Sequence, residues 1–510
     1  MFKLKYSLIF SLFLVFGVFL GDQLVLSQVE AETLLILNPN IVQYTMPCGN
    51  TTDNACPNIA VALSATNSTN IVLDLGNYTY TGPNNTNINL VNITLTVQGN
   101  PNAYATVDLA ENGLLFSIMD SQQKHGDVVL TLQYLNIVNG TGFHGVYGGV
   151  IYITTNYSNT ILLLENVVVS NCNAYYGGVV SLQTTLNSYI TFSNSTFTNN
   201  SGTFGSVFYT TNFCQVNISN SNIVGNQGNN GIIYLVNGTI TMSNVLIDSN
   251  VGGSSILKFS NNGNVIINNM TLTNNSVQRV VDPMGGGVMM LFQNFVQLYN
   301  SVISNNVGSA PISFNSIGTF IIAGTLINNN NASAFGGAIA LNHGALFVTN
   351  CVFASNYALQ SGGAIYIFDA QTLKLTNTTF TGNSVGPDGS GSVLYIDNVA
   401  SNSFNGVTFS HNLIKDSINP IFCDDSDIVI NNITSDTDSL VSCSNGGRAG
   451  CKFTGNYDIT EMSCPSEGRL SPGAIAGIIV GSIAGILLLV LVVYIIKKRH
   501  HNHHKYHSYH

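Results

Sequence analysis

The chain has 510 residues, of which 45% are hydrophobic and only 7% are charged, and its formal net charge is −10. The hydrophobic content argues against a disordered chain, although the charged fraction is far below the roughly 25% of a typical soluble domain. Residues 28–470 contain 23 acidic and 8 basic side chains. This stretch therefore offers no basic stripe that could neutralise nucleic-acid phosphates, and we expect no nucleic-acid partner.

Residues 1–27 have the pattern of a secretory signal peptide. Lys3 and Lys5 precede an apolar run, and cleavage is expected after Ser27. A retained membrane anchor is the competing interpretation. Residues 28–60 are expected to form an N-terminal cap. Cys48 and Cys56 frame a short loop there, and an oxidising compartment favours a disulfide between them.

Residues 61–420 repeat two short phrases. The opening phrase is glycine-rich: GGVIY (148–152), GGVVS (177–181), GSVFY (205–209), GIIYL (231–235), GGVMM (286–290), GGAIA (336–340), GGAIY (362–366) and GSVLY (391–395). The closing phrase ends in asparagine, at Asn171, Asn200, Asn226, Asn250, Asn275, Asn306, Asn330, Asn356, Asn383 and Asn412. The mean period is close to 27 residues, which indicates a solenoid or a propeller.

The residues between the phrases decide which repeat architecture this is. Short runs rich in Val, Ile, Phe, Thr and Tyr are strand formers, and the array shows no helical periodicity. Helical repeats are excluded on that ground, and a propeller blade needs more residues than one period supplies. We therefore predict an all-β fold, a parallel β-helix. Its coils should stack about 4.8 Å apart, with asparagines forming a ladder and glycines forming sharp corners.

The alternating GGAI-type and FxxN phrases resemble the repeats of polymorphic outer membrane proteins. They also resemble other right-handed parallel β-helix proteins of the pectin-lyase-like superfamily. The opening CGNTTDNACPNIAVALSATNSTNIVLDLGNYTY (48–80) is similar to the start of such arrays, with a cysteine pair, a short apolar helix-like piece and a strand. The resemblance covers residues 48–412 and implies the fold rather than an activity. Bacterial members end in an outer-membrane barrel, whereas this sequence is expected to end in a transmembrane helix.

Two fragments raise the alternative of an enzyme. Polygalacturonase-like enzymes use an Asp pair followed by a His-Gly motif, whereas here NHG (342–344) precedes CDDSD (423–427). Between Val128 and Ile247 the only charged residue is Glu165, so these coils lack an acid–base pair. We predict no catalytic, cofactor-binding or metal-binding residue. Whether the acids between Asp369 and Asp427 form a site is left open, because solvated turn residues and a calcium site both fit CDDSD.

The remaining cysteines and the sequons fit a secreted surface. Cys172, Cys214 and Cys351 lie within repeats and are expected to be buried thiols. Residues 421–472 form a Cys-rich juxtamembrane segment with two expected disulfides of open connectivity, made by Cys423, Cys443, Cys451 and Cys464. N-glycosylation is predicted at sixteen Asn-x-Ser/Thr sequons: Asn50, Asn67, Asn77, Asn84, Asn92, Asn139, Asn156, Asn194, Asn199, Asn217, Asn237, Asn269, Asn274, Asn331, Asn377 and Asn432.

Residues 473–496 predict one transmembrane helix, because 474–496 is a 23-residue run without a charge. Lys497, Lys498 and Arg499 follow and place the tail, 497–510, on the cytoplasmic side. A stripe of Gly473, Gly477, Gly481 and Gly485 would allow two helices to approach and form a homodimer. A helix face that is merely rich in small residues is the other interpretation.

Together these features predict a single-pass type I glycoprotein of the plasma membrane or of an endomembrane. We expect adhesion, recognition or structural display, with glycans or surface proteins as ligands. The alternative is a membrane-tethered polysaccharide lyase or glycoside hydrolase, which would require several acids or bases converging on one groove.

Overall fold

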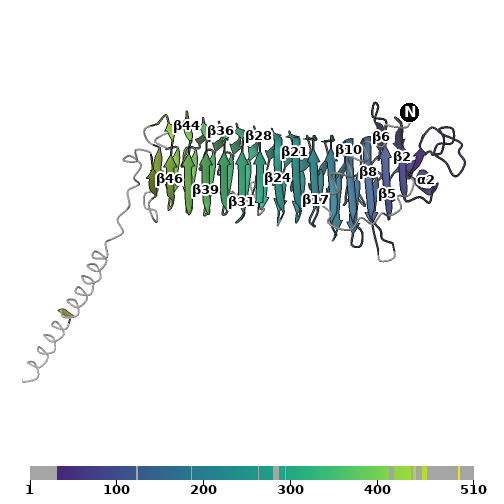
Figure 1. Cartoon of the computed structure of the whole chain (residues 1–510), viewed down its shortest axis with the longest axis horizontal. Coiled ribbons are helices and arrows are strands. Elements are labelled where there is room, and N and C mark those ends of the chain that lie inside the picture. Colours follow the sequence, from purple (N-terminus) through teal and green to yellow (C-terminus); the bar gives the residue numbers. More distant parts are fainter. Residues whose placement is uncertain are drawn as a thin grey trace, which may run out of the picture. The chain divides into compact units, whose positions relative to one another are not determined.

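The computed structural model confirms an all-β parallel solenoid with about 13 turns. It describes residues 32–121, 124–184, 186–261, 263–278, 286–292, 295–412, 419–437, 440–443, 451–456 and 492–493. The chain divides into two compact units at residues 222 and 223. Within each unit the strands of successive coils lie side by side, as the row of arrows in Figure 1 shows.

Each complete coil passes through three parallel sheets in turn, here called sheets 1, 2 and 3. One coil of the second unit contains β27 (Phe295–Tyr299) and β28 (Val302–Ser304) in sheet 1. The same coil continues through β29 (Val307–Gly308) in sheet 2 and β30 (Ile312–Asn315) in sheet 3. Each strand pairs in parallel with its equivalent in the following coil, so side chains at one position form a column.

The described residues of the first unit contain ten whole strands of sheet 1: β1 (Thr33–Ile36), β2 (Asn70–Asp74), β3 (Thr79–Thr81), β5 (Ile93–Gln98), β6 (Ala105–Asp108), β8 (Val128–Val138), β10 (Thr160–Ser170), β13 (Ser188–Ser193), β14 (Thr196–Thr198) and β17 (Gln215–Ser219). Its strands of sheet 2 are β11 (Asn173–Tyr176) and β15 (Ser201–Phe204). Its strands of sheet 3 are β4 (Ile88–Asn89), β7 (Phe116–Met119), β9 (Ile151–Thr155), β12 (Val180–Thr184) and β16 (Phe208–Thr210). Strand β18 (Asn222–Val224) lies at the unit boundary.

The second unit repeats the pattern. Sheet 1 continues in β21 (Thr239–Asp248), β24 (Asn264–Thr273), β31 (Thr319–Ala323), β32 (Leu326–Asn328), β35 (Ala345–Thr349), β36 (Val352–Ala354), β39 (Thr372–Thr376), β40 (Thr379–Thr381), β43 (Ser401–Asn405), β44 (Thr408–Ser410), β46 (Asp427–Asn431), β47 (Thr434–Ser435) and β49 (Lys452–Gly455). Sheet 2 also contains β19 (Gln227–Gly228), β22 (Val251–Gly252), β25 (Ser276–Val277), β33 (Asn331–Ala332), β37 (Tyr357–Ala358) and β41 (Ser384–Val385). Sheet 3 also contains β20 (Ile233–Val236), β23 (Ser255–Ser260), β26 (Gly287–Phe292), β34 (Ile339–Asn342), β38 (Ile365–Phe368), β42 (Leu394–Asp397), β45 (Ile421–Asp424) and β48 (Val441–Cys443).

The N-terminal end of the first unit is closed by a short cap. Helix α2 (Ile59–Ser64) is the helix-like piece that the sequence predicts, and it buries Ile59 and Ala62. Its N-cap residue Asn58 accepts a hydrogen bond from the Val61 amide, as N-caps commonly do. A single 3₁₀ turn, η1 (Pro83–Asn85), follows. The cap keeps the ends of the apolar core out of water.

The core is filled by columns of apolar side chains, since alternate residues of each strand point inward. In the second unit Phe353, Phe380 and Phe409 stack coil on coil, with ring centroids 4.9 and 5.4 Å apart. All three rings are buried. Such offset or parallel ring pairs add to the stabilisation that burial gives.

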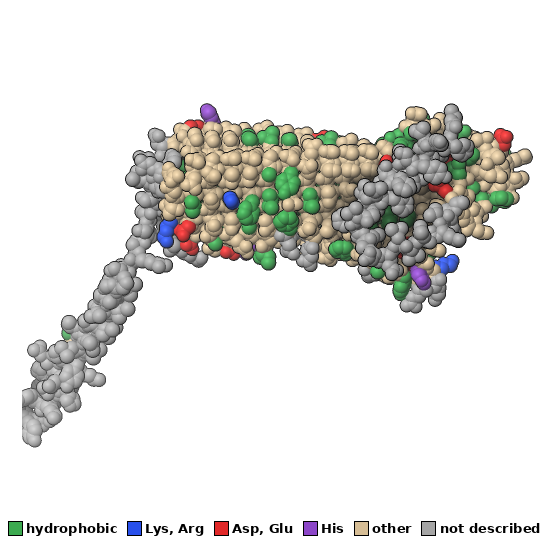
Figure 2. All heavy atoms as spheres, viewed as in Figure 1, with side chains coloured by type: hydrophobic (Ala, Val, Ile, Leu, Met, Phe, Trp, Pro, Cys, Tyr) green, Lys and Arg blue, Asp and Glu red, His purple; other side chains and the backbone are tan. Residues whose placement is uncertain are grey.

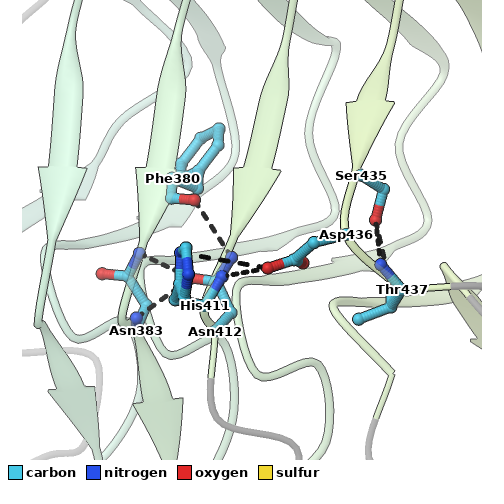
Figure 3. A network of polar contacts seen from close by, with 7 residues as sticks. All are labelled: Phe380, Asn383, His411, Asn412, Ser435, Asp436 and Thr437. Atoms are coloured by element: carbon cyan, nitrogen blue, oxygen red, sulfur yellow. Dashed lines mark hydrogen bonds and ion pairs between the residues drawn. The ribbon is translucent and has the colours of Figure 1, made fainter.

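An asparagine ladder runs through the second unit, as the closing phrase predicts. It joins Asn226, Asn250, Asn275, Asn306, Asn330, Asn356, Asn383 and Asn412, of which all but Asn412 are completely buried. Each amide donates to the amide oxygen of the following coil or to a carbonyl of the preceding one. Figure 3 shows Asn383 and Asn412 on adjacent coils, with Asn412 reaching the carbonyl of Phe380 at 3.0 Å. Because these buried amides hydrogen-bond one another, the row avoids the energetic cost of unpaired polar groups in the core.

The expected ladder position of Asn171 is wrong by one residue. Ser170 pairs with Thr198, so Asn171 is aligned with the exposed Asn199, and Cys172 is aligned with the ladder residue Asn200. The Cys172 amide donates to the Asn200 side-chain oxygen at 3.0 Å. Asn171 instead adopts a left-handed conformation with φ of 57°, which asparagine tolerates better than most residues.

The glycine phrase forms the corner between sheets 2 and 3. Gly148, Gly177, Gly205, Gly336, Gly362 and Gly391 all have φ between 55° and 68°. A Cβ at any of these positions would lie 2.0–2.4 Å from the carbonyl oxygen three residues later. Only glycine fits such a corner, because any other side chain would meet backbone there.

Candidate functional site

All sixteen sequon asparagines lie at the surface of the part of the chain that the structure describes. Fourteen are exposed, and Asn139 and Asn237 are half-buried. Nine of the sixteen occupy corner positions with positive φ, where the chain turns between strands. Their accessibility meets the steric requirement for glycosylation, which stays a prediction.

The cysteines form both bridges and buried thiols. Cys48 is bonded to Cys56, and Cys423 is bonded to Cys451. Cys443 is also disulfide-bonded, whereas Cys464 lies outside the described residues. Cys423 lies in β45, Cys443 lies in β48, and Cys451 directly precedes β49, so the segment predicted as juxtamembrane still contains solenoid strands.

Cys172, Cys214 and Cys351 are free and buried, as the sequence predicts. Burial raises the pKa of the Cys172 and Cys214 thiols to about 12, and it raises the pKa of Cys351 as well. A thiol with that pKa is thiolate in only about one molecule in ten thousand at pH 8.

We therefore expect these three thiols to resist alkylation by iodoacetamide at pH 8 in the native protein. In guanidinium chloride all three should react, because unfolding restores an ordinary thiol pKa and removes the steric barrier. Mass spectrometry of the labelled peptides measures the outcome. Labelling of Cys172 under native conditions would contradict the buried position in the ladder column.

The two fragments that resemble an enzyme lie three coils apart along one edge of sheet 3 in the second unit. Asn342, Phe368, Asp397 and Asp424 share one position at the ends of their sheet 3 strands, and each is paired with the next. His343, Asp369, Asn398 and Asp425 form the neighbouring column, with φ between 41° and 65°. The solenoid thus brings NHG and CDDSD to one edge, although 80 residues separate them in the sequence.

Contacts along this edge are polar and open to solvent. His343 Nε2 lies 3.1 Å from Asp369 Oδ2, and both side chains are roughly half exposed. Asn398 donates to the other oxygen of Asp369 at 2.8 Å. Asp369 is therefore fixed between two neighbours, an arrangement that orients a carboxylate without withdrawing it from water. A polar contact this exposed contributes little to stability.

An aromatic column lies beside these acids on the outer face of sheet 3. Tyr366, Tyr395 and Phe422 stack with centroid distances of 4.7 and 4.8 Å and interplanar angles of 13° and 10°. The ring of Phe335 extends the column at 4.5 Å from Tyr366. The Tyr395 hydroxyl reaches Asp397 Oδ2 at 3.5 Å. Because the rings cover one another's faces, the column presents ring edges and hydroxyls to solvent.

Burial and acidic neighbours keep these phenols protonated. Burial, followed by the charge of Asp397, raises the pKa of Tyr366 to about 12. Burial and the same carboxylate also raise the pKa of Tyr395. Both hydroxyls are therefore neutral hydrogen-bond donors at physiological pH rather than phenolate bases. We call Tyr366, Tyr395 and Phe422, together with Asp369 and Asp397, the aromatic–acidic edge.

The first unit has a related aromatic cluster at its glycine corner. Tyr147 stacks on Tyr152 of the same coil at 4.8 Å and on Tyr176 of the next coil at 5.4 Å. Phe204 and Tyr209 continue the cluster on the following coil. The aromatic residue before the glycines thus meets the one after them on the outside of the corner.

Sequence reasoning missed these aromatic columns, although the phrases contain the signal. GGVIY, GSVFY, GGAIY and GSVLY all end in tyrosine, at Tyr152, Tyr209, Tyr366 and Tyr395. Strand alternation places this fifth residue on the outer face, since the residues on either side of it point into the core.

A metal site is not evident among the described residues, where no group of three or more His, Cys, Asp or Glu side chains converges. The predicted transmembrane segment, 473–496, lies outside the described residues except for 492–493, and the whole tail, 497–510, and residues 1–31 also lie outside them. Among the described residues no helix has the length and apolar character needed to cross a bilayer.

No family model matches the chain. The chain is similar to a transmembrane domain-containing protein of Dictyostelium discoideum, with 24% identity over 269 residues, which cover 47% of this chain and 16% of the relative. It is also similar to a metabotropic glutamate receptor-like protein of Dictyostelium discoideum, with 26% identity over 172 residues, which cover 33% of this chain and 10% of that protein. The matched regions therefore span a small part of each relative.

Proposed function

We propose that the protein is a single-pass type I glycoprotein of the plasma membrane or an endomembrane, and that its ectodomain is a right-handed β-helix for recognition or adhesion. The sequence supports membrane anchorage through the uncharged run 474–496 followed by Lys497, Lys498 and Arg499. The names of the two Dictyostelium relatives, a transmembrane domain-containing protein and a receptor-like protein, agree with that proposal.

The aromatic–acidic edge is the observation that carries the recognition role. It places a hydroxyl and a carboxylate on each of two adjacent coils, Tyr366 with Asp369 and Tyr395 with Asp397, and successive coils lie about 4.8 Å apart. A ligand whose hydroxyl groups recur at a spacing similar to that of the coils could form one hydrogen bond with each coil. Glycan chains have that property, so we propose a glycan or a glycosylated surface protein as the ligand.

A membrane-tethered glycoside hydrolase is a second candidate, favoured by one observation. Asp397 and Asp424 are register partners on adjacent coils. Strand spacing of about 4.8 Å resembles the roughly 5 Å separation of the carboxyl groups in retaining glycosidases. Tyr366 and Tyr395, whose raised pKa values keep them neutral, would then serve as substrate-binding groups.

A glycan array probed with the full-length chain in nanodiscs tests the proposal, with release of reducing sugar measured in parallel. Tyr395→Ala should abolish retention of the bound glycan, because it removes one hydroxyl and opens the stack. Tyr189→Ala, an exposed tyrosine of the first unit, is the matched control and should bind as the wild type does.

Two outcomes separate the candidates. Binding of a glycan without release of reducing sugar supports recognition. Cleavage that Asp424→Asn abolishes would replace the recognition role by the hydrolase. If Tyr395→Ala bound every glycan as strongly as the wild type does, the aromatic–acidic edge would be rejected as the binding site.

A further inference from the structure

A second surface of the second unit carries apolar side chains on the outside of sheet 1. We call it the apolar patch; it consists of Phe295, Tyr299, Val302, Ile321, Leu326, Phe347 and Val352. Each of these side chains is half-buried except Val352, which is 38% exposed. They belong to three consecutive coils.

Register makes the patch contiguous. Val302 pairs with Leu326, which pairs with Val352. In the parallel column Ile321 pairs with Phe347. Figure 2 shows hydrophobic side chains gathered in the middle of this face, whereas the rest of the sheet is mostly neutral and polar. Contiguous apolar surface on an otherwise polar sheet marks an interaction site.

The patch lies in a stretch without charge. From Pro283 to Phe368 the sequence contains no Asp, Glu, Lys or Arg, although acids outnumber bases nearly three to one across residues 28–470. Two copies of such an acidic chain repel each other wherever their acids approach. They can meet closely where charge is absent, which is at these coils.

Sequons flank the patch but are missing from its sheet 1 corners. The flanking coils carry Asn269, Asn274 and Asn377, each followed by Ser or Thr at the second position. In the three patch coils four of the six equivalent corners keep asparagine with positive φ but not the sequon, at Asn300, Asn305, Asn329 and Asn350, and the other two are Gly324 and Ser355. The face of the patch is therefore free of predicted glycans, as a protein-binding face requires.

The size of the patch suits a weak contact. Three strands about 4.8 Å apart and about eight residues long cover on the order of 400 Å², against roughly 800 Å² per partner in a standard interface. Such a contact gains strength when both partners are confined to one surface, because the effective concentration rises. That gain rests on the membrane anchorage proposed above.

We propose that the apolar patch binds the same patch of a second copy of this chain, face to face. A two-fold arrangement makes the contact self-complementary and closed. Two flat sheets pack in this way at about 10 Å, with side chains interdigitating between them. The contact is separate from the Gly473–Gly485 stripe, so the ectodomain itself holds the dimer.

Fluorescence resonance energy transfer between labelled full-length chains in liposomes, titrated over protein density, tests the proposal. Val302→Thr creates a sequon at Asn300, and a glycan there would separate the two faces. We expect the density for half-maximal transfer to rise at least tenfold. Asn222→Thr is the matched control, because it creates a sequon at Asn220, also a positive-φ corner, outside the patch.

A second pair of variants does not depend on glycosylation. Ile321→Asp should raise the same density, whereas Val429→Asp should not, although Val429 belongs to the same outward column three coils beyond Phe347. Gly477→Leu with Gly481→Leu should leave the patch-dependent transfer in place. Wild-type transfer in both Ile321→Asp and glycosylated Val302→Thr would overturn the proposal, whatever the glycan array shows.

Discussion

Replacing Asn330 with leucine is expected to lower the free energy of unfolding of the second unit by about 3–5 kcal/mol. Leucine keeps the volume of the side chain but removes its amide. The Asn330 oxygen accepts from the backbone and side-chain nitrogens of Asn306 at 3.0 and 3.1 Å. Its nitrogen donates to the Ile303 carbonyl at 2.9 Å and to the Asn356 amide oxygen at 3.0 Å.

The loss is large because the ladder is buried. The Asn306 backbone amide and the Ile303 carbonyl would each be left in the core without the partner that Asn330 supplies, and an unsatisfied buried group costs about 1–3 kcal/mol. Equilibrium unfolding in urea, followed by circular dichroism, measures the change. Asn329→Gly is the control, because its exposed side chain lies one residue away and glycine accepts its φ of 53°. Equal midpoints for the two variants would refute the structural role of the ladder.

The fold could be predicted because the repeated sequence pattern is specific to a β-solenoid. Glycine and asparagine return at a steady interval, and the structure places both at corners where only their conformations or amides fit. The N-terminal helix at Ile59 and the buried thiols were predictable for the same kind of reason, since short apolar segments and isolated cysteines in repeats favour burial.

Register within the repeat was harder to predict. The phrase VVSN places Asn171 at the ladder, but the register aligns Val169 with Phe197 and Ser170 with Thr198, so Cys172 takes the ladder position. A one-residue shift exchanges inside and outside in a strand. No sequence rule distinguishes the two asparagine roles, because both the ladder and the exposed corner use this residue.

The apolar patch could not be distinguished from the core by sequence. In the run Phe320-Ile321-Ile322 every residue is apolar, so alternation leaves open which of them points outward. The structure buries Phe320 and Ile322 and leaves Ile321 on the outer face. The aromatic–acidic edge was hidden for another reason: Tyr366 and Tyr395 are 29 residues apart, and coils of unequal length obscure their contact.

Replacing Gly177 with alanine is expected to destabilise the first unit by about 3–5 kcal/mol, or to prevent its folding. Gly177 has a φ of 68°, which alone costs an alanine on the order of 1 kcal/mol. The added Cβ would also lie 2.2 Å from the Val180 carbonyl oxygen and 2.5 Å from its carbon. Backbone cannot yield as a flexible side chain can, so the corner between sheets 2 and 3 must open.

Gly145→Ala separates the two contributions. Gly145 belongs to the same unit and has a φ of 71°, but no atom lies within 4 Å of its would-be Cβ. Gly145→Ala should therefore lower the stability only by the conformational cost, about 1 kcal/mol, in thermal unfolding of the protein. The difference between the two alanines measures how tightly the corner is closed. If both variants unfold at the same temperature, a clash of the Cβ with the backbone is not the reason for glycine at the first position of the phrase. The positive φ alone would then explain why glycine recurs at all six corners.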